Sequence, residues 1–295
     1  MTLSIQPANP SRPAFFGEVS GIDLRQPVPR DAVAAIEAGM DRFAVLVFHD
    51  QRIDDEQQLA FTRNFGPLEM ATGDIRQTDR RLSIAVNDIS NVDRDSKVLA
   101  RDDRARLFGL GNMLWHSDSS FKPTPAKYSL LSARVLPSSP GGNTEFADMR
   151  AAWDALDAET SALVQDLVCE HSQIYSRGVL GFTDFTEEER LKWAPVLQRL
   201  VRRHPVTGRR SLYLSAHAGT IVGWPVPEAR ALLRDLVEHA TQREFVHAHS
   251  WRQFDLVMWD NRVMMHRGRR YNIAEVRDLH RTTVADVAPT LEQAA

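Results

Sequence analysis

The sequence predicts a mainly β protein with helical insertions, in which a β-sandwich or barrel core carries helices on its outside. Short apolar runs of strand length, such as residues 44–48 and 128–136, are spread along the chain of 295 residues. Segments with helical periodicity lie between them, and no shift in composition marks a domain boundary. Since strands and helices must bury their apolar faces against another layer, we expect a single layered domain over residues 1–295.

The first half of the chain alternates helix and strand before a long polar segment. Residues 31–42 have apolar positions at helical spacing, and residues 54–65 begin with paired acids, which stabilise a helix N-terminus. The apolar run 44–48 between them indicates a buried strand. Residues 70–111 are polar apart from a short strand candidate at 82–86. Loops of this length are usually functional, so we expect a mobile active-site loop around residues 70–111.

The second half carries most of the predicted strands. They are expected at residues 128–136, 144–146, 212–214, 244–249, 255–259 and 282–285. Helices are expected at 151–168, in one or two pieces, and at 227–241, where proline occupies the first turn.

Composition narrows the class of protein. The chain has 36 Lys and Arg against 39 Asp and Glu, a net charge of −3, so we expect no general attraction to nucleic acid or an anionic membrane. No apolar run approaches the roughly 20 residues that span a bilayer, and we expect no secretory signal. The single Cys169 cannot form an internal disulfide, which favours a reducing, cytoplasmic compartment. Phosphate-binding glycine motifs and a nucleophile elbow are absent from the sequence.

The sharpest candidate for chemistry is His116 followed two residues later by Asp118. Side chains alternate along a strand, so this spacing puts an imidazole and a carboxylate on one face. His266 offers a third ligand, and two histidines with one carboxylate leave three positions of an octahedral iron open. An ordinary polar surface pair is the alternative interpretation. His247 and His249 are a second same-face pair, for which a solvated strand face is the alternative.

Six arginines lie between residues 262 and 281, which leaves three interpretations of that stretch. They are a solvated face, a nucleic-acid surface, and a site for carboxylates, which the planar guanidinium binds with two parallel hydrogen bonds. Few stacking aromatics accompany the run and the chain is acidic, which argues against nucleic acid. Arg277 and Arg281 share one face of the predicted strand and could hold two different small carboxylates.

Taken together, these motifs resemble the taurine dioxygenase-like Fe(II)/2-oxoglutarate-dependent dioxygenases, and within them the 2,4-dichlorophenoxyacetate (2,4-D) dioxygenases. The resemblance covers nearly the whole chain and rests on residues 21–24, 45–48, 61–69, 88–92, 115–121 (WHSDSSF), 146–152, 257–262, 266–271 and 281–283.

The resemblance implies a double-stranded β-helix (jelly-roll) core and assigns His116, Asp118 and His266 as the iron ligands. It places Arg277 and Thr144 at the far carboxylate of 2-oxoglutarate and Trp259 in the lining of the cosubstrate pocket. It further places Arg281 at the carboxylate of the prime substrate, with Ser119 and Lys97 as substrate contacts. The chain departs from this pattern in two places. Asn143 stands where close relatives tend to have Asp, and the loop after Glu69 offers only Arg76 as a cation where relatives can carry lysine.

The expected reaction is hydroxylation of the carbon next to the ether oxygen of a phenoxyacetate such as 2,4-D, with Fe(II) as cofactor and 2-oxoglutarate and O2 as cosubstrates. Its products are a phenol, glyoxylate, succinate and CO2. The expected partner is a small aromatic carboxylic acid, and we expect a homo-oligomer. The alternatives are a dioxygenase of a sulfonate or other small organic acid, a cupin-like metal protein with other chemistry, and a non-catalytic protein that binds metal and 2-oxoglutarate.

Overall fold

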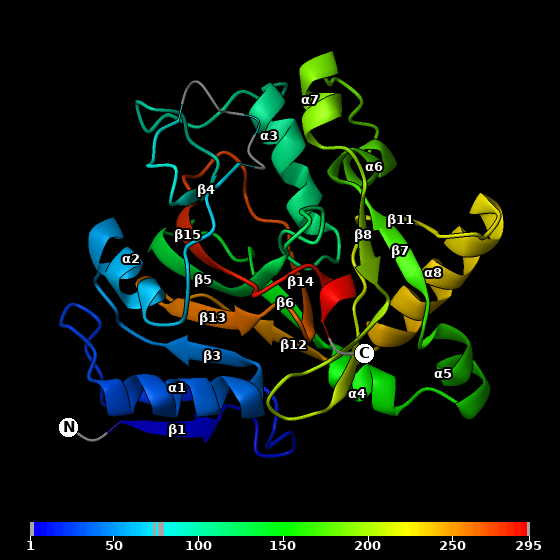
Figure 1. Ribbon diagram of the computed structural model, residues 1–295. Helices are drawn as coiled ribbons and strands as arrows, with labels where there is room; N and C mark the ends of the chain where they lie inside the picture. The colour runs from blue at the N-terminus through cyan, green and yellow to red at the C-terminus, as the bar shows by residue number, and fades with distance from the viewer. Residues whose placement is uncertain (1–2, 73–74, 76–79, 294–295) are drawn as a thin grey trace.

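Two facing sheets, antiparallel except for the parallel pair β2 and β3, form the centre of the protein. The computed structural model describes residues 3–72, 75 and 80–293. The larger sheet has the strand order β1-β2-β3-β13-β5-β15-β4, and the smaller one β12-β6-β14 (Figure 1). The strands of the larger sheet are β1 (Ser4–Pro7), β2 (Gly17–Ser20), β3 (Val45–Phe48), β4 (Asn87–Ser90), β5 (Ala126–Val135), β13 (Leu256–Asp260) and β15 (Asp278–Ala285). Those of the smaller sheet are β6 (Thr144–Asp148), β12 (Val246–His249) and β14 (Met264–Gly268).

Helices cover the outside of these sheets, with further short strands beside them (Figure 1). The helices are α1 (Arg30–Phe43), α2 (Asp55–Arg63), α3 (Arg104–Gly109), α4 (Met149–Asp154), α5 (Ala158–Val164), α6 (Gln173–Val179), α7 (Glu187–Lys192) and α8 (Val226–Ala240), with 3-10 turns at Leu110–Met113 and Thr290–Glu292. The remaining strands are β7 (Val168–His171), β8 (Val196–Arg199) and β11 (Ala218–Ile221) in one sheet, and β9 (Val201–Arg203) and β10 (Arg210–Leu212) in another. Within the described residues, no helix is both long and apolar enough to cross a membrane.

The larger sheet is apolar on both faces because alternate residues of its strands enter different cores. On β3, Leu46 and Phe48 pack with the buried side chains of α1 and α2. Val45 and Val47 of the same strand point the other way, into a core shared with Phe146 of the smaller sheet. A third core lies between the smaller sheet and helices α4 and α8. The site described below sits at the end of the core between the two sheets.

The structure confirms the mainly β fold class with helical insertions. The helices predicted at 31–42, 54–65 and 227–241 correspond to α1, α2 and α8, and the segment 151–168 is helical in two pieces, α4 and α5. Asp54 begins α2 by accepting a hydrogen bond from the backbone N of Gln57, whose side chain bonds back to it. Asp157 begins α5 in a similar way through Thr160.

The strand predicted at 82–86 is wrong, and strand β4 follows it at Asn87–Ser90 instead. The hydrogen bond from Val86 N to Ser83 O closes a turn in the predicted segment. Pairing with β15 fixes the strand further along the chain, where Arg81 bridges Asp88 and Asp278 at 2.9 and 2.5 Å. Helix α3 in the same long segment carries no clear sequence signal. Arg76 lies outside the described residues.

Phe146 gives a test of the core between the sheets. It is fully buried on β6, with its ring 5.6 Å from Trp259 and 5.8 Å from Phe16. We expect Phe146→Ala to lower the free energy of unfolding by about 3–5 kcal/mol in urea titrations, and Phe146→Leu to lower it by less. A loss below about 1 kcal/mol for the alanine variant would contradict this packing.

Candidate active site

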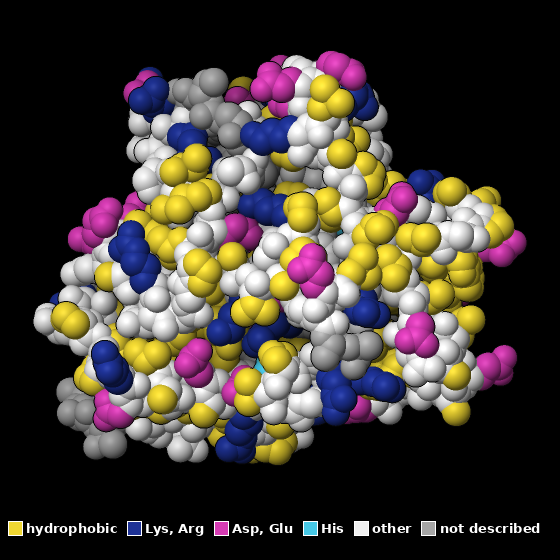
Figure 2. Space-filling view, in the orientation of Figure 1, with side chains coloured by type: hydrophobic (Ala, Val, Ile, Leu, Met, Phe, Trp, Pro, Cys, Tyr) yellow, Lys and Arg dark blue, Asp and Glu magenta, His cyan; other side chains and the backbone are white. Residues whose placement is uncertain are grey.

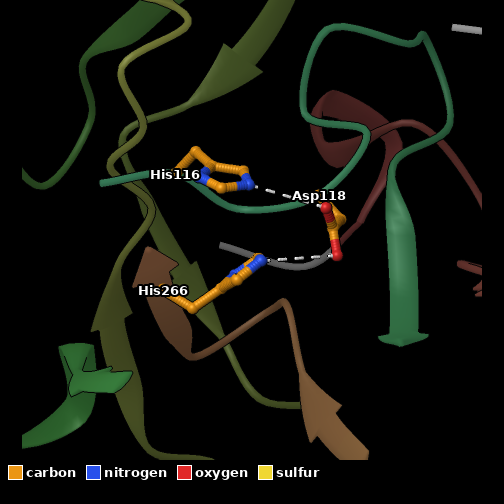
Figure 3. Close-up of side chains that lie close together, drawn as sticks. All are labelled: His116, Asp118 and His266. Carbon is orange, nitrogen blue, oxygen red and sulfur yellow. Dashed lines mark ion pairs between the residues drawn. The ribbon is translucent and has the colours of Figure 1, made fainter. Parts of the chain in front are cut away.

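Backbone pairing brings His116 and His266 together from distant parts of the chain. His116 N donates to His266 O at 3.0 Å, and His266 N donates to His116 O at 2.8 Å. Directly paired residues project their side chains to the same side, and the two imidazole centroids lie 4.2 Å apart. Asp118 follows two residues after His116, so its carboxylate returns to that side. Figure 3 shows both rings turned toward the carboxylate.

The spacing of these three side chains fits a bound cation. His116 Nε2 lies 3.8 Å from Asp118 Oδ1, and His266 Nε2 lies 3.7 Å from Asp118 Oδ2. These distances are too long for hydrogen bonds, yet all the ligand atoms lie within 4.8 Å of one another. His116 Nδ1 is 2.7 Å from the carbonyl of Leu114, which can only accept. Nδ1 therefore carries the proton and Nε2 keeps a lone pair for a metal.

The protonation states of the three groups suit metal binding. Burial opposes ionisation of Asp118, but Arg281, His266 and His116 outweigh it and lower the pKa of the carboxyl to about 2. Burial lowers the pKa of His116, and that of His266 well below its usual value. The site thus offers one anionic and two neutral ligands, the set that leaves open positions on a non-haem iron. It is the single group of this kind found among the described residues.

Neighbouring side chains fix the position of Asp118. Its backbone N donates to Asn261 Oδ1 at 3.0 Å, and Ser129 Oγ donates to its Oδ2 at 2.7 Å. Arg281 Nη1 donates to the other carboxylate oxygen. Trp259 Nε1 also donates to Asn261 Oδ1, at 3.0 Å, so the same amide supports both the carboxylate and the indole.

A cavity of about 810 Å³ adjoins the three ligands. Its lining includes eight Lys and Arg side chains but three carboxylates, although the chain as a whole is slightly acidic. Lysine and arginine also gather near the centre of the face in Figure 2. This charge distribution favours anionic molecules in the cavity.

Arg277 is buried in the wall of this cavity without an acidic partner among the described residues. It is 8% exposed, its Nε has no hydrogen-bond partner, and its Nη2 donates to Gly142 O at 3.3 Å. Burial lowers its pKa. Gly142 has a φ of +73°, and a Cβ there would lie 3.3 Å from Arg277 Nε, so glycine makes the close approach possible. An unpaired buried guanidinium of this kind is suited to a carboxylate ligand.

Thr144 and Trp259 also line the cavity. The Thr144 hydroxyl accepts a hydrogen bond from Trp251 Nε1 at 3.0 Å. The Trp259 ring packs 4.6 Å from that of His266, centroid to centroid. Both residues, together with Arg277, line the same cavity as the three metal-ligand candidates.

The three residues predicted on the substrate side have different surroundings. Arg281, on β15, lines the cavity beside Asp118, and its Nε has no hydrogen-bond partner. Ser119 lines it too, but its hydroxyl donates to Glu69 Oε1 at 2.7 Å. The structure does not bring Lys97 to the cavity lining. Lys97 belongs to a turn closed by Asp93, whose Oδ1 accepts from Lys97 N at 2.9 Å.

The second histidine pair does not form a metal group in the described residues. The His247 ring stacks on Phe16 at 3.9 Å, and His249 Nε2 lies 3.1 Å from Asp255 Oδ2. Sequence reasoning missed two features of the site. Asn261 holds Asp118 and could have been suspected from its place two residues after Trp259. Arg177 lines the cavity from α6, and nothing in its local sequence distinguishes it.

Comparisons with known proteins agree with this geometry. The model of the taurine catabolism dioxygenase TauD, TfdA family matches residues 5–283. The chain is 49% identical to the alpha-ketoglutarate-dependent 2,4-dichlorophenoxyacetate dioxygenase of Cupriavidus pinatubonensis, over 95% of this chain and 98% of that protein. It is 38% identical to the (S)-phenoxypropionate/alpha-ketoglutarate-dioxygenase of Sphingobium herbicidovorans, over 85% of each chain.

A similar solved structure is the crystal structure of AAD-2 in complex with Mn(II) and N-oxalylglycine. Its TM-score is 0.94 at 59% sequence identity, over 98% of this chain and 100% of that chain. The agreement extends over the core sheets and the helices around them, and confirms the jelly-roll fold class. The chain therefore belongs to the taurine catabolism dioxygenase TauD, TfdA family.

Proposed function

We propose that this protein hydroxylates the carbon next to the ether oxygen of a phenoxyacetate such as 2,4-D. It is an Fe(II)- and 2-oxoglutarate-dependent dioxygenase. The observation that carries the proposal is the group of His116, Asp118 and His266 in a cationic cavity, beside the unpaired buried Arg277. Two relatives that cover most of the chain are named for 2,4-dichlorophenoxyacetate and (S)-phenoxypropionate, which share the aryloxy acid group.

His116, Asp118 and His266 would hold Fe(II) through two nitrogens and one oxygen. Iron bound there supplies the activation of O2 that is coupled to oxidative decarboxylation of 2-oxoglutarate to succinate and CO2. Arg277 binds the far carboxylate of 2-oxoglutarate, with the Thr144 hydroxyl beside it. Trp259 closes the wall next to His266 and excludes water. N-oxalylglycine, bound in AAD-2, is a dicarboxylate in which NH replaces one methylene of 2-oxoglutarate.

Arg281 holds the carboxylate of the phenoxyacetate and so decides which carbon faces the metal. Its guanidinium already lies against Asp118, so a carboxylate bound to it is adjacent to the iron ligands. A fixed carboxylate keeps the neighbouring C–H in the reactive orientation. Hydroxylation of that carbon gives a hemiacetal, which collapses to the phenol and glyoxylate. Ser119 contributes to the same side of the cavity. Lys97 would reach the substrate only if its turn moved.

We also propose that residues 1–295 act as one catalytic domain, and that the enzyme works in the cytoplasm as a homo-oligomer. The buried free thiol of Cys169 suits a reducing compartment. Light scattering on the purified protein tests the oligomer, and cell fractionation tests the location.

Oxygen consumption with Fe(II), 2-oxoglutarate and a panel of acids tests the function. We expect 2,4-D and phenoxyacetate to stimulate O2 uptake and to release a phenol, while taurine and alkyl sulfates do not. Asp118→Ala removes the anionic ligand and should abolish the stimulated uptake. Faster turnover of a sulfonate or sulfate ester would show that this compound class, and not the phenoxyacetates, is the substrate. No stimulation by any acid would favour a non-catalytic protein that binds metal and 2-oxoglutarate.

The pKa shifts predict how metal affinity depends on pH. Burial keeps the pKa values of both histidines below the usual value, and that of Asp118 is about 2, so the ligands are mainly deprotonated between pH 8 and pH 6.5. Protons therefore begin to compete only at lower pH. We expect the Kd for Mn(II), measured calorimetrically on metal-free protein, to stay constant within about twofold over this range. A progressive weakening from pH 8 downward would contradict it.

Paired arginine variants test which acid each arginine binds. Arg277→Ala should raise the KM for 2-oxoglutarate at least roughly tenfold, because it removes a charge-assisted pair in a buried site. Arg281→Lys keeps the charge but loses the two-pronged geometry, so it should raise the KM for 2,4-D and leave that for 2-oxoglutarate nearly unchanged. Because Arg281 contacts the metal ligand Asp118, the Kd of the Arg281→Lys variant for Mn(II) is the control. An unchanged Kd shows that the metal site is intact. Equal effects of Arg281→Lys on both acids would contradict the assignment.

A further inference from the structure

Arg177 is a buried cation that has no acidic partner among the described residues. It is 6% exposed, and no carboxylate in the described part of the chain pairs with it. Its Nε has no hydrogen-bond partner, and Nη1 donates to the Ser176 hydroxyl at 3.2 Å. Isolating a charge from water is costly, and burial lowers the pKa of this guanidinium to about 10. A ligand acid is the partner that such a group lacks.

The surroundings hold the Arg177 guanidinium in a defined place. Its Cζ lies 4.5 Å from the centre of the Phe108 ring, which supports it through a cation–π contact. On another side it packs against Gly111, where a Cβ would lie 2.2 Å from Cζ, so only glycine leaves the necessary room. A long, flexible cation fixed between a ring and a glycine has lost much of its conformational freedom before any ligand arrives.

Arg177 lies in the same cavity as the iron ligands, on the side of His217. The His116 and His217 rings are 6.1 Å apart, and His217 Nδ1 is 2.9 Å from Ser176 Oγ, which also accepts from Arg177. Arg177 is therefore linked to the ligand His116 through Ser176 and His217, whereas Arg281 contacts the ligand Asp118 directly. Arg281 is thus the better placed arginine for the carboxylate whose neighbouring carbon reacts.

Part of the cavity wall next to His116 is aromatic. Phe121 and His217 both line the cavity and meet edge to face, with centroids 4.9 Å apart. If a phenoxyacetate binds with its carboxylate at Arg281, as in the proposed function on which this inference rests, its aryl ring lies along this wall. The ring position opposite the ether oxygen then points toward Arg177.

We propose that Arg177 is a second anion-binding subsite at the aryl end of the cavity, and that the enzyme prefers aryloxyacetates with an acidic group on the ring opposite the ether oxygen. After hydroxylation, the two-carbon acid at the ether end leaves as glyoxylate. The acidic group on the ring remains on the phenol product. A neutral alkyl substituent in the same place leaves the guanidinium without a partner.

Matched substrates and variants test this subsite. The probes are 4-carboxyphenoxyacetate and 4-isopropylphenoxyacetate, which are similar in size and differ in charge at the ring end. In wild type we expect a higher kcat/KM for the carboxylated compound. Arg177→Gln should reduce the ratio of the two kcat/KM values at least roughly tenfold, and Arg177→Lys by less. Arg104→Gln is the control, because Arg104 lies on nearby α3 but is already paired with Glu189 at 2.7 Å.

Three results would overturn the proposal: no preference in wild type, an unchanged ratio in Arg177→Gln, or the same fall in the ratio in Arg104→Gln. If Arg177→Gln does not fold, the calorimetric Kd values of both probes for wild-type protein loaded with Mn(II) and N-oxalylglycine decide instead. Equal affinities would then reject the subsite. If 2,4-D is not oxidised either, the proposed function fails, and the same binding comparison still tests Arg177 separately.

Discussion

The pair of backbone hydrogen bonds between His116 and His266 is the constraint on which the site depends. These residues are 150 positions apart, and neither bond involves a side chain. The bridge sets the spacing of the two imidazoles, and the two-residue repeat of extended chain then places Asp118 beside them. The two sheets make the bridge possible, because β14 carries His266 and pairs with β6, whose Phe146 fills the core beneath it. The packing between the sheets therefore also determines the geometry of the metal ligands.

Charge organises the rest of the cavity. Asp118 is an anion beside the cation Arg281, whereas Arg277 and Arg177 are cations with no acidic partner among the described residues. Protein interiors rarely keep unpaired charges, since desolvation is not compensated. Two such arginines in one cavity, with Arg281 beside the metal ligands, define a site that is completed by small acids. Apolar and aromatic side chains line the same cavity and limit which acids fit.

Part of this arrangement could be predicted from the sequence. Short-range spacing suggested the His116 and Asp118 pair, and the family resemblance implied the roles of the other site residues. The His116 and Asp118 pair needs only the strand repeat, and the strands at 44–48, 128–136 and 255–259 are marked by their apolar residues. The strand at 82–86 failed because the polar β4 is held by pairing with β15 and by Arg81, which are contacts distant in sequence. Arg177 could not be found, since its significance lies in the absence of an acid and in the closeness of Phe108 and Gly111. Lys97 was expected to contact the substrate but does not line the cavity. Its position in a motif did not determine the course of the turn that carries it.

The hydrogen bond between Arg281 and Asp118 links two binding equilibria. A cation bound to Asp118 neutralises part of the negative charge that attracts Arg281. It therefore weakens that hydrogen bond and makes the guanidinium more available to an incoming acid. Thermodynamic reciprocity then requires that an acid bound to Arg281 strengthen the hold of Asp118 on the cation. By this argument, metal and organic acid each favour the binding of the other through the single carboxylate of Asp118.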